Sequence, residues 1–462
     1  MISQAHRSGR APLKQRFLKG GAWSVAGFGV SQLIRFGANL VLTRLLVPDM
    51  FALMSIATIV MTGLNLVSDL GVRPNIVRSE RGADPAFLNT AWSLQIGRGV
   101  ILWVAAIAAS FLPRLAVHMD LVPSASVYAD PRLPYVISAI SLSVFIGGFV
   151  STKMHEAYRN LTIGRVSQIE IGSQAAGLLV TFAWLVFDRS ISALVAGTLF
   201  SSLTRTVFSH VWLTGRSNRW QWEKSAFWEI FHFGKWITIS SLIAFFANSG
   251  DRMILAGLVD KTALGVYVIA FSAVNIIDLT LRRVISGVMF PALSEIIRER
   301  PHKLRATYYK MHAVAAGFAY FCAGMLMVSG QAVIHVLYDP RYAEAGWMLE
   351  ILAIMLLALP FQITIQSFLA LGNPKVQSFV AAVRLIALFA GMPLGFSLFG
   401  LPGALWAAVC GQFLPLPIAI FYSVRYQIFD LRREALTLPI VFVGMGAGWL
   451  IDFAIRSFER LS

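Results

Sequence analysis

The sequence has few charged residues. Asp, Glu, Lys and Arg make up 13% of the 462 residues, whereas a soluble domain carries about 25%. Hydrophobic residues make up 57%, and they form continuous apolar runs of about twenty residues along the whole chain. Such runs exclude an outer-membrane barrel, whose strands alternate over segments of about ten residues. The composition therefore predicts an all-α protein that crosses a membrane many times.

Cysteine is also scarce. The only two cysteines, Cys322 and Cys410, lie in separate apolar segments. They form no metal-ligand spacing and no disulfide framework. We therefore predict that both are core residues, and we expect no metal and no other cofactor.

Long loops and catalytic motifs are missing as well. No connecting segment is long enough to hold a soluble domain, the histidines are scattered, and no D-x-D or H-x-x-x-H motif occurs. A membrane-embedded polysaccharide polymerase or glycosyltransferase would need a catalytic cluster on a sizeable loop. We predict that the protein is not an enzyme, and we keep this class as the alternative.

The net charge of +16 does not indicate nucleic-acid binding. Basic residues gather in alternate loops, which is the positive-inside pattern of an inner-membrane protein. The N-terminal segment 1–19 is basic and has no acidic residue, which predicts a cytoplasmic N-terminus; its basic residues are Arg7, Arg10, Lys14, Arg16 and Lys19. The apolar run that follows is too long for a signal peptide and has no A-x-A site.

Thirteen apolar segments are long enough to be helices. They cover approximately 20–46, 49–72, 88–112, 134–153, 164–187, 190–213, 230–257, 262–291, 310–334, 344–371, 375–398, 401–424 and 437–455. An odd number of spans would place the C-terminus outside, although Arg456 and Arg460 oppose this. The sequence leaves open whether the last segment spans the membrane.

A weak internal repeat divides the chain near its midpoint. Residues 21–78 align without gaps on 234–291, pairing Gly21 with Gly234 and Trp23 with Trp236. Six segments separate the two copies, so both enter the membrane from the same side, as parallel repeats do. Between the halves, residues 214–229 mix Trp with Lys and Arg, which predicts a linker that lies along the inner membrane interface.

Several short motifs, in this order and spacing, resemble the Wzx-type polysaccharide flippases, in the superfamily of the MATE exporters and lipid II flippases. The motifs are GGAWSVAGFGVSQLIRFGANLVLTRLLVPDMFALMSIA at 20–57, SDLGVRPNIVR at 68–78, GDRMILAGLVDKTALGVYVIA at 250–270, MFPALSEI at 289–296, WMLEILAIML at 347–356, LALGNPK at 369–375 and GLPGALWAA at 400–408.

This resemblance implies two six-helix bundles around a central cavity, with about one extra C-terminal helix. The bundles would cover 20–213 and 230–424, and the extra helix 425–462. The implied activity is the flipping of undecaprenyl-diphosphate-linked oligosaccharide to the outer leaflet, driven by a proton or sodium gradient. It would serve exopolysaccharide or lipopolysaccharide synthesis, beside membrane lipids, a polysaccharide polymerase and export proteins. Family members with a longer C-terminus have two final helices, where this chain has one apolar segment after 424.

Four arginines are candidates for binding the diphosphate. At a rise of 1.5 Å per residue, Arg98 lies about 15 Å from the inner end of its segment, and Arg35 and Arg384 lie at similar depth. Charges at this depth need a cavity, an anion or a carboxylate partner. We predict that Arg35, Arg98, Arg252 and Arg384 form a cationic cavity, because guanidinium binds phosphate oxygens bidentately.

Two acidic residues are candidates for ion coupling. Glu170 and Asp278 lie deeper in their segments than Asp69, which fits an interface position. Buried carboxylates can be tuned to titrate, so we predict that Glu170 and Asp278 couple transport to the ion gradient. Arg282 and Arg283 fit interface anchors equally well, and Asp251 fits a local partner of Arg252.

A multidrug exporter of the same fold is the second alternative. A cavity for cationic drugs is expected to be acidic or aromatic, whereas these segments carry more Arg than acid. Amide side chains inside the segments, which include Asn248, Asn275, Gln362 and Gln412, are candidates for contacting sugar. Hydrogen bonding between helices explains such side chains equally well.

Overall fold

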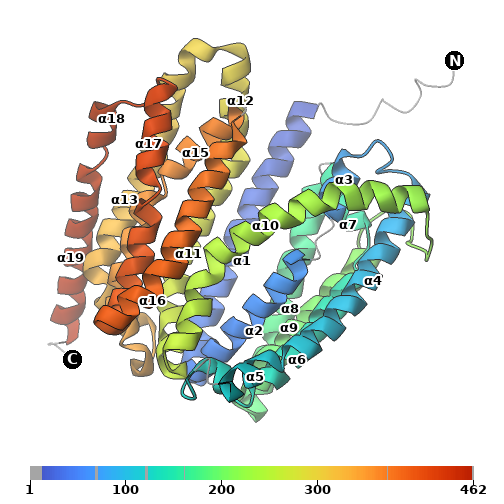
Figure 1. Cartoon of the computed structure of the whole chain (residues 1–462), viewed down its shortest axis with the longest axis horizontal. Coiled ribbons are helices and arrows are strands. Elements are labelled where there is room, and N and C mark those ends of the chain that lie inside the picture. Colours follow the sequence, from blue (N-terminus) through green and yellow to red (C-terminus); the bar gives the residue numbers. More distant parts are fainter. Residues whose placement is uncertain (1–12, 68–70, 120–122, 161, 372, 460–462) are drawn as a thin grey trace. The chain divides into compact units, whose positions relative to one another are not determined.

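The computed structural model describes residues 13–67, 71–119, 123–160, 162–371 and 373–459. Within these ranges every regular element is a helix, and the one β-bridge joins Ser126 to Asp260. Figure 1 shows the helices in chain order. Arg7 and Arg10 of the basic N-terminal segment lie outside the described residues, as does Asp69.

The described residues before the predicted linker form nine helices. They are α1 (Leu13–Leu45), α2 (Pro48–Val67), α3 (Val72–Arg78), α4 (Pro85–Ala109), α5 (Leu112–His118), α6 (Leu133–Gly148), α7 (Lys153–Arg159), α8 (Ile163–Phe187) and α9 (Ile191–Val211). A short 3-10 turn, Val127–Ala129, lies between α5 and α6.

The second half continues in the same way. Its helices are α10 (Lys224–Leu258), α11 (Lys261–Val284), α12 (Phe290–Glu299), α13 (Leu304–Leu337), α14 (Ala345–Ala353), α15 (Phe361–Ala370), α16 (Pro374–Phe413), α17 (Leu416–Arg425), α18 (Leu431–Ala435) and α19 (Pro439–Glu459). A π-turn, η2 (Ile285–Met289), follows α11, and 3-10 turns cover η3 (Pro301–Lys303), η4 (Pro340–Tyr342) and η5 (Ile354–Ala358).

In the described residues each predicted apolar segment contains helix, and two of them, 375–398 and 401–424, share the long helix α16. In the described part, nine helices are long and apolar enough to cross a membrane, or ten if α6 and α7, bent by 64°, form one span. The predicted boundary near residue 400 is a break inside α16, where Gly400 has φ 63° and ψ −151°. This left-handed conformation suits glycine, which has no Cβ to clash.

By their contacts the described residues group into two compact units. Unit 1 contains residues up to 38 together with 64–109 and 137–240, and unit 2 contains 39–63, 110–136 and 241–462. Both α1 and α10 therefore contribute residues to each unit. The predicted bundles at 20–213 and 230–424 divide the chain differently, and these bounds stay a prediction.

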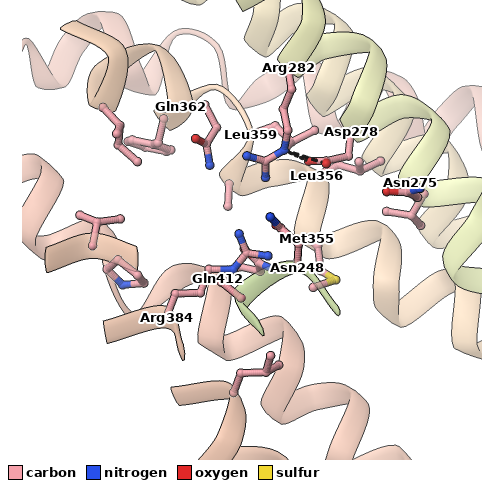
Figure 2. A pocket seen from close by; sticks show the side chains of 18 of the residues that line it. Asn248, Asn275, Asp278, Arg282, Met355, Leu356, Leu359, Gln362, Arg384 and Gln412 are labelled. Carbon is pink, nitrogen blue, oxygen red and sulfur yellow. Dashed lines mark hydrogen bonds and ion pairs between the residues drawn. The ribbon is translucent and has the colours of Figure 1, made fainter. Parts of the chain in front are cut away.

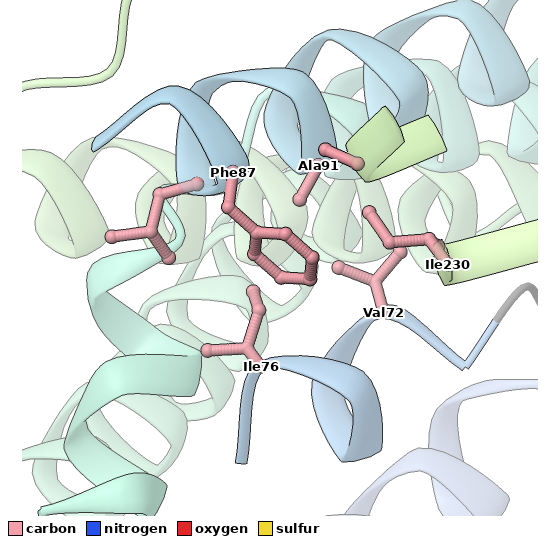
Figure 3. Packing of buried hydrophobic residues seen from close by; sticks show 7 residues of the cluster. Val72, Ile76, Phe87, Ala91 and Ile230 are labelled. Carbon is pink, nitrogen blue, oxygen red and sulfur yellow. The ribbon is translucent and has the colours of Figure 1, made fainter. Parts of the chain in front are cut away.

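The predicted linker, 214–229, is not one irregular segment. Its last residues, from Lys224 on, are the first turns of α10. This part of α10 packs in unit 1 against α3 and α4, in a buried apolar cluster to which all three helices contribute (Figure 3). Phe87, Ile76 and Ile230 in this cluster are fully buried. Ahead of the helix, backbone N–H groups of Gln221 and Glu223 donate to hydroxyls of α4, so the segment follows that helix.

In unit 2 the last helix packs closely along α13. Glycines permit this approach: a Cβ at Gly444 or Gly448 of α19 would overlap the carbonyl oxygen of Phe321 or Met325, and one at Gly324 of α13 would overlap that of Val441. Small residues allow two membrane helices to come close in this way. The two helices run side by side in Figure 1.

The prediction that both cysteines are core residues is wrong for one of them. Cys322 of α13 is half-buried, whereas Cys410 of α16 is exposed. An apolar sequence on all sides of a helix does not distinguish the face toward the protein from the face toward lipid.

Candidate functional site

Unit 2 contains a cavity of about 260 Å³. Its walls come from α10, α11, η5, α15, α16 and α17. The charged and amide side chains that line it are Asn248, Asp251, Asn275, Asp278, Arg282, Gln362, Arg384 and Gln412. This volume lies just below the roughly 300–1,000 Å³ of pockets that enclose a drug-sized ligand, so a compact charged group fits and an oligosaccharide does not.

An ion pair lies on the α11 wall of the cavity. Nε of Arg282 donates to both carboxylate oxygens of Asp278, at 2.8 and 2.7 Å. The two residues are four apart on one helix, a spacing that places their side chains on the same face. Asp278, predicted to couple ions, thus lines the cavity with an arginine partner, and Arg282, considered as an interface anchor, is part of the cavity wall.

Arg384 lines the cavity from α16. Its guanidinium makes no ion pair and no hydrogen bond with any residue in the described part of the chain. Figure 2 shows Arg384, Arg282 and Gln362 facing the same space. An arginine at this depth without a fixed carboxylate partner is available to an anion.

Four of the amide side chains singled out in the sequence come together here. Asn248 lies on α10, Asn275 on α11, Gln362 on α15 and Gln412 on α16. Their separation along the chain hides this proximity in the sequence. Together with the arginines they give the cavity both donors and acceptors, which is the chemistry that sugar hydroxyls and phosphate oxygens need.

A second polar cluster adjoins the cavity at α10. Asp251 is buried and accepts a hydrogen bond from the hydroxyl of Tyr267 at 2.6 Å, while Nε of Arg252 lies 3.6 Å from its other oxygen. The guanidinium of Arg252 lies 4.7 Å from the centroid of the Phe271 ring and donates to the carbonyl of Asn248. Asp251 lines the cavity, whereas Arg252 does not. The sequence did not predict Asp251 as a site residue, because an ion pair with the adjacent Arg252 already explained its presence in an apolar segment.

The remaining candidates lie in unit 1. Arg35 is exposed on α1. In α4, Nη2 of Arg98 donates to the backbone carbonyl of Asn65 at 2.6 Å and to its side-chain oxygen at 3.2 Å. Glu170 of α8 lies 3.9 Å from Nη2 of Arg205, and both side chains are about half exposed. The cationic cavity and the ion-coupling role therefore stay predictions for these three residues.

Outside the spans, Asp130 forms a buried ion-pair cluster in unit 2. Its carboxylate accepts hydrogen bonds from Arg132 at 2.9 Å and from Nζ of Lys261 at 3.0 Å. Burial alone would raise the pKa of Asp130, but the hydrogen bonds from Arg132 and Lys261 outweigh it and hold the pKa well below its usual range. This cluster joins the segment before α6 to the start of α11.

The chain is similar to polysaccharide biosynthesis proteins and to transporters of known structure. A family model described as "Polysaccharide biosynthesis protein" matches residues 41–346. The lipopolysaccharide biosynthesis protein WzxC of Escherichia coli (strain K12) is 21% identical over 355 residues, which cover 74% of this chain and 67% of WzxC.

Two solved structures share the fold over most of its length. The lipid II flippase MurJ in an inward closed conformation has a TM-score of 0.68 at 12% identity, covering 94% of this chain and 98% of MurJ. An inward-facing MATE multidrug resistance transporter of the MOP superfamily has a TM-score of 0.62 at 14% identity, covering 87% and 94%. The predicted resemblance and the all-α polytopic membrane fold are confirmed: the chain belongs to the polysaccharide biosynthesis protein family and has the fold of the MATE and MurJ transporters.

Proposed function

We propose that this protein is a flippase that moves undecaprenyl-diphosphate-linked oligosaccharide from the cytoplasmic to the outer leaflet. The product serves exopolysaccharide or lipopolysaccharide synthesis. The family match and the relative WzxC support the substrate class, and the MurJ-like fold supports the transport of a lipid-linked headgroup. The protein acts as a transporter and not as an enzyme.

The observation that carries this proposal is that Arg384 lines the cavity of unit 2 and has no ion-pair partner among the described residues. Asp278 is paired with Arg282, and Asp251 is paired with Arg252 beside the cavity, so among these described residues the positive charge of Arg384 is the one without an acidic partner. A diphosphate is a multiply charged anion that a guanidinium binds through two parallel hydrogen bonds. The amides around Arg384 would then contact the first sugar.

The predicted cationic site extends this proposal to other arginines. Arg35, Arg98 and Arg252 would guide the diphosphate along its path, while Arg384 binds it in the cavity. Of these, Arg384 has the strongest support, because Arg98 and Arg252 already donate hydrogen bonds within the protein. Glu170 and Asp278 remain the proposed ion-coupling carboxylates.

The membrane setting completes the proposal. The protein lies in the bacterial inner membrane with its N-terminus in the cytoplasm, because the basic loops follow the positive-inside pattern. A proton or sodium gradient drives the flipping step. A polysaccharide polymerase and export proteins act on the flipped product.

Depletion of the protein in living cells tests the proposal. We expect lipid-linked oligosaccharide to accumulate on the cytoplasmic face, where it is shielded from an external glycan-modifying enzyme. The matched control is a strain that lacks the first glycosyltransferase, in which no such lipid accumulates. Unchanged lipid-linked oligosaccharide together with raised sensitivity to cationic drugs would contradict the flippase and indicate the drug exporter.

A further inference from the structure

A buried histidine on α13 faces a carboxylate of the C-terminal segment. His312 is fully buried, and its Nε2 lies 3.3 Å from Oε2 of Glu434, whose side chain is 14% exposed. Neither ring nitrogen of His312 has a hydrogen bond of good geometry within the described chain. A buried polar side chain that lacks a fixed partner is costly, so its presence in the core needs an explanation.

The other charged groups near this pair are engaged with one another. Asp430, at the start of α18, lies 2.9 Å from Arg305 and 3.5 Å from Arg433. Glu434 has no arginine or lysine partner among the described residues, and its second oxygen accepts a hydrogen bond from Tyr309 at 3.2 Å. The basic group that faces it is therefore His312.

The surroundings of the pair contain few other groups that can titrate. Three tyrosines of α13 interact electrostatically with Glu434, namely Tyr308, Tyr309 and Tyr320. From the C-terminal segment come Asp430 and Arg433, and α15 contributes only Phe361 and Thr364, which do not titrate. Within this set, the imidazole of His312 and the carboxyl of Glu434 face each other and can share one proton without breaking another ion pair.

The pair also contacts the wall of the cavity. The His312 ring stacks on Tyr308, with centroids 5.6 Å apart, and meets the edge of Phe361 at 6.1 Å. Phe361 lines the cavity on α15, and the hydroxyl of Tyr308 is 2.7 Å from that of Thr364 on the same helix. The His312 ring is therefore next to α15, through Phe361 and through Tyr308, which is hydrogen-bonded to Thr364.

We propose that His312 and Glu434 form a proton-binding site that controls the α15 wall of the cavity. When His312 is neutral and Glu434 is ionised, the pair carries one buried negative charge. One added proton, on Nε2 of the imidazole or on the carboxyl, brings the net charge to zero and closes a hydrogen bond between the two side chains. This inference rests on the proposed transport function and adds a proton-binding site to the proposed ion-coupling carboxylates Asp278 and Glu170.

A fluorophore in the cavity wall tests the proton-binding site without any transport assay. Bimane is attached to a Gln362→Cys variant of the full chain in which Cys322 and Cys410 are replaced by alanine. Its emission is followed from about pH 5.5 to pH 8.5, the range in which histidine and buried carboxyl groups titrate. We expect a single pH-dependent change in emission, and its loss after His312→Gln and after Glu434→Gln. The control is His335→Gln near the other end of α13, which should keep the change.

Two outcomes would overturn the proposal. The pH-dependent emission could persist in the Glu434→Gln protein. This variant retains the shape of the side chain, so it decides the question alone if His312→Gln does not give a monodisperse protein. Alternatively, the variants could lower the thermal stability and leave the pH response intact. This would show that the pair only stabilises the packing of α18 on α13.

Transport measurements separate this proposal from the proposed function. In vesicles with an imposed pH gradient, the wild type should flip lipid-linked oligosaccharide faster than without the gradient, and both variants should lose this stimulation while keeping basal flipping. Absence of flipping by the wild type at any pH would refute the proposed function. Normal flipping with an unchanged pH-gradient response in both variants would refute the proton-binding site alone.

Discussion

Nε of Arg282 donates hydrogen bonds to both carboxylate oxygens of Asp278, and the pair lines the cavity of unit 2. The two side chains are about a quarter to a third exposed. The ion pair makes the α11 wall of the cavity neutral. Arg384 on α16 therefore remains available to bind an anion.

Removal of Arg282 should destabilise the protein. Arg282→Ala leaves the Asp278 carboxylate without its arginine in a low-dielectric site, and a hydrogen bond to a charged group contributes about 1.5–3 kcal/mol, less where solvent reaches it. We expect a lower midpoint of thermal unfolding in detergent. Arg298→Ala, whose side chain is 76% exposed on α12, is the control and should have little effect. Equal stability of the two variants would show that the pair does not stabilise α11.

Removal of Arg384 should impair flipping more than folding. The lost hydrogen bonds to the diphosphate correspond to about 1.5–3 kcal/mol, or a decrease in the flipping rate of about tenfold or more. Arg384→Lys keeps the charge but not the planar fork, so it should restore only part of the rate. The rate is measured with fluorescent lipid-diphosphate sugar in vesicles. Full restoration by lysine would argue against bidentate binding.

The Asp130 cluster predicts a pH dependence of stability. Its folded pKa is depressed, so the cluster stabilises the protein above the unfolded pKa of about 3.9 and loses this contribution as the pH falls through the folded pKa. Asp130→Asn should therefore lower the unfolding midpoint at neutral pH, and the difference from wild type should shrink below about pH 4. A difference that does not depend on pH would show that packing, and not charge, is responsible.

The glycines of α19 offer a matched pair of substitutions. A Cβ at Gly444 would overlap the backbone of α13, whereas a Cβ at Gly446 meets no atom within 4 Å. Gly444→Ala should destabilise the protein by about 1–3 kcal/mol through overpacking, and Gly446→Ala should not. Thermal unfolding of the two variants decides this. An equal effect would mean that α19 does not pack on α13 as described.

The positions of the helices could be predicted from the sequence. In the described residues each predicted apolar segment contains helix, and the boundary near residue 400 falls on Gly400, which has a positive φ. The start of α10 could not, because Lys224 begins a helix inside a stretch whose Trp, Lys and Arg are typical of an interface. Packing of Ile230 against Phe87 outweighs that local signal.

The composition of the candidate site was only partly predictable. Depth along a helix follows from the rise per residue, and Arg384 lies well inside α16 as its position in the apolar segment predicts. The face of a helix that is apolar all round does not follow from sequence. For this reason Arg252, predicted for the cavity, lies beside it, while Arg282 and Asp251 line it.

The flipping of lipid-linked oligosaccharide by the purified full-length protein in vesicles is the most direct test of the central claim. With diphosphate-linked substrate in one leaflet, we expect the wild type to move it to the other leaflet. The Arg384→Ala protein should be slower by about tenfold or more, because the anion loses its guanidinium partner. No transfer by the wild type, or equal rates for wild type and Arg384→Ala, would contradict the account.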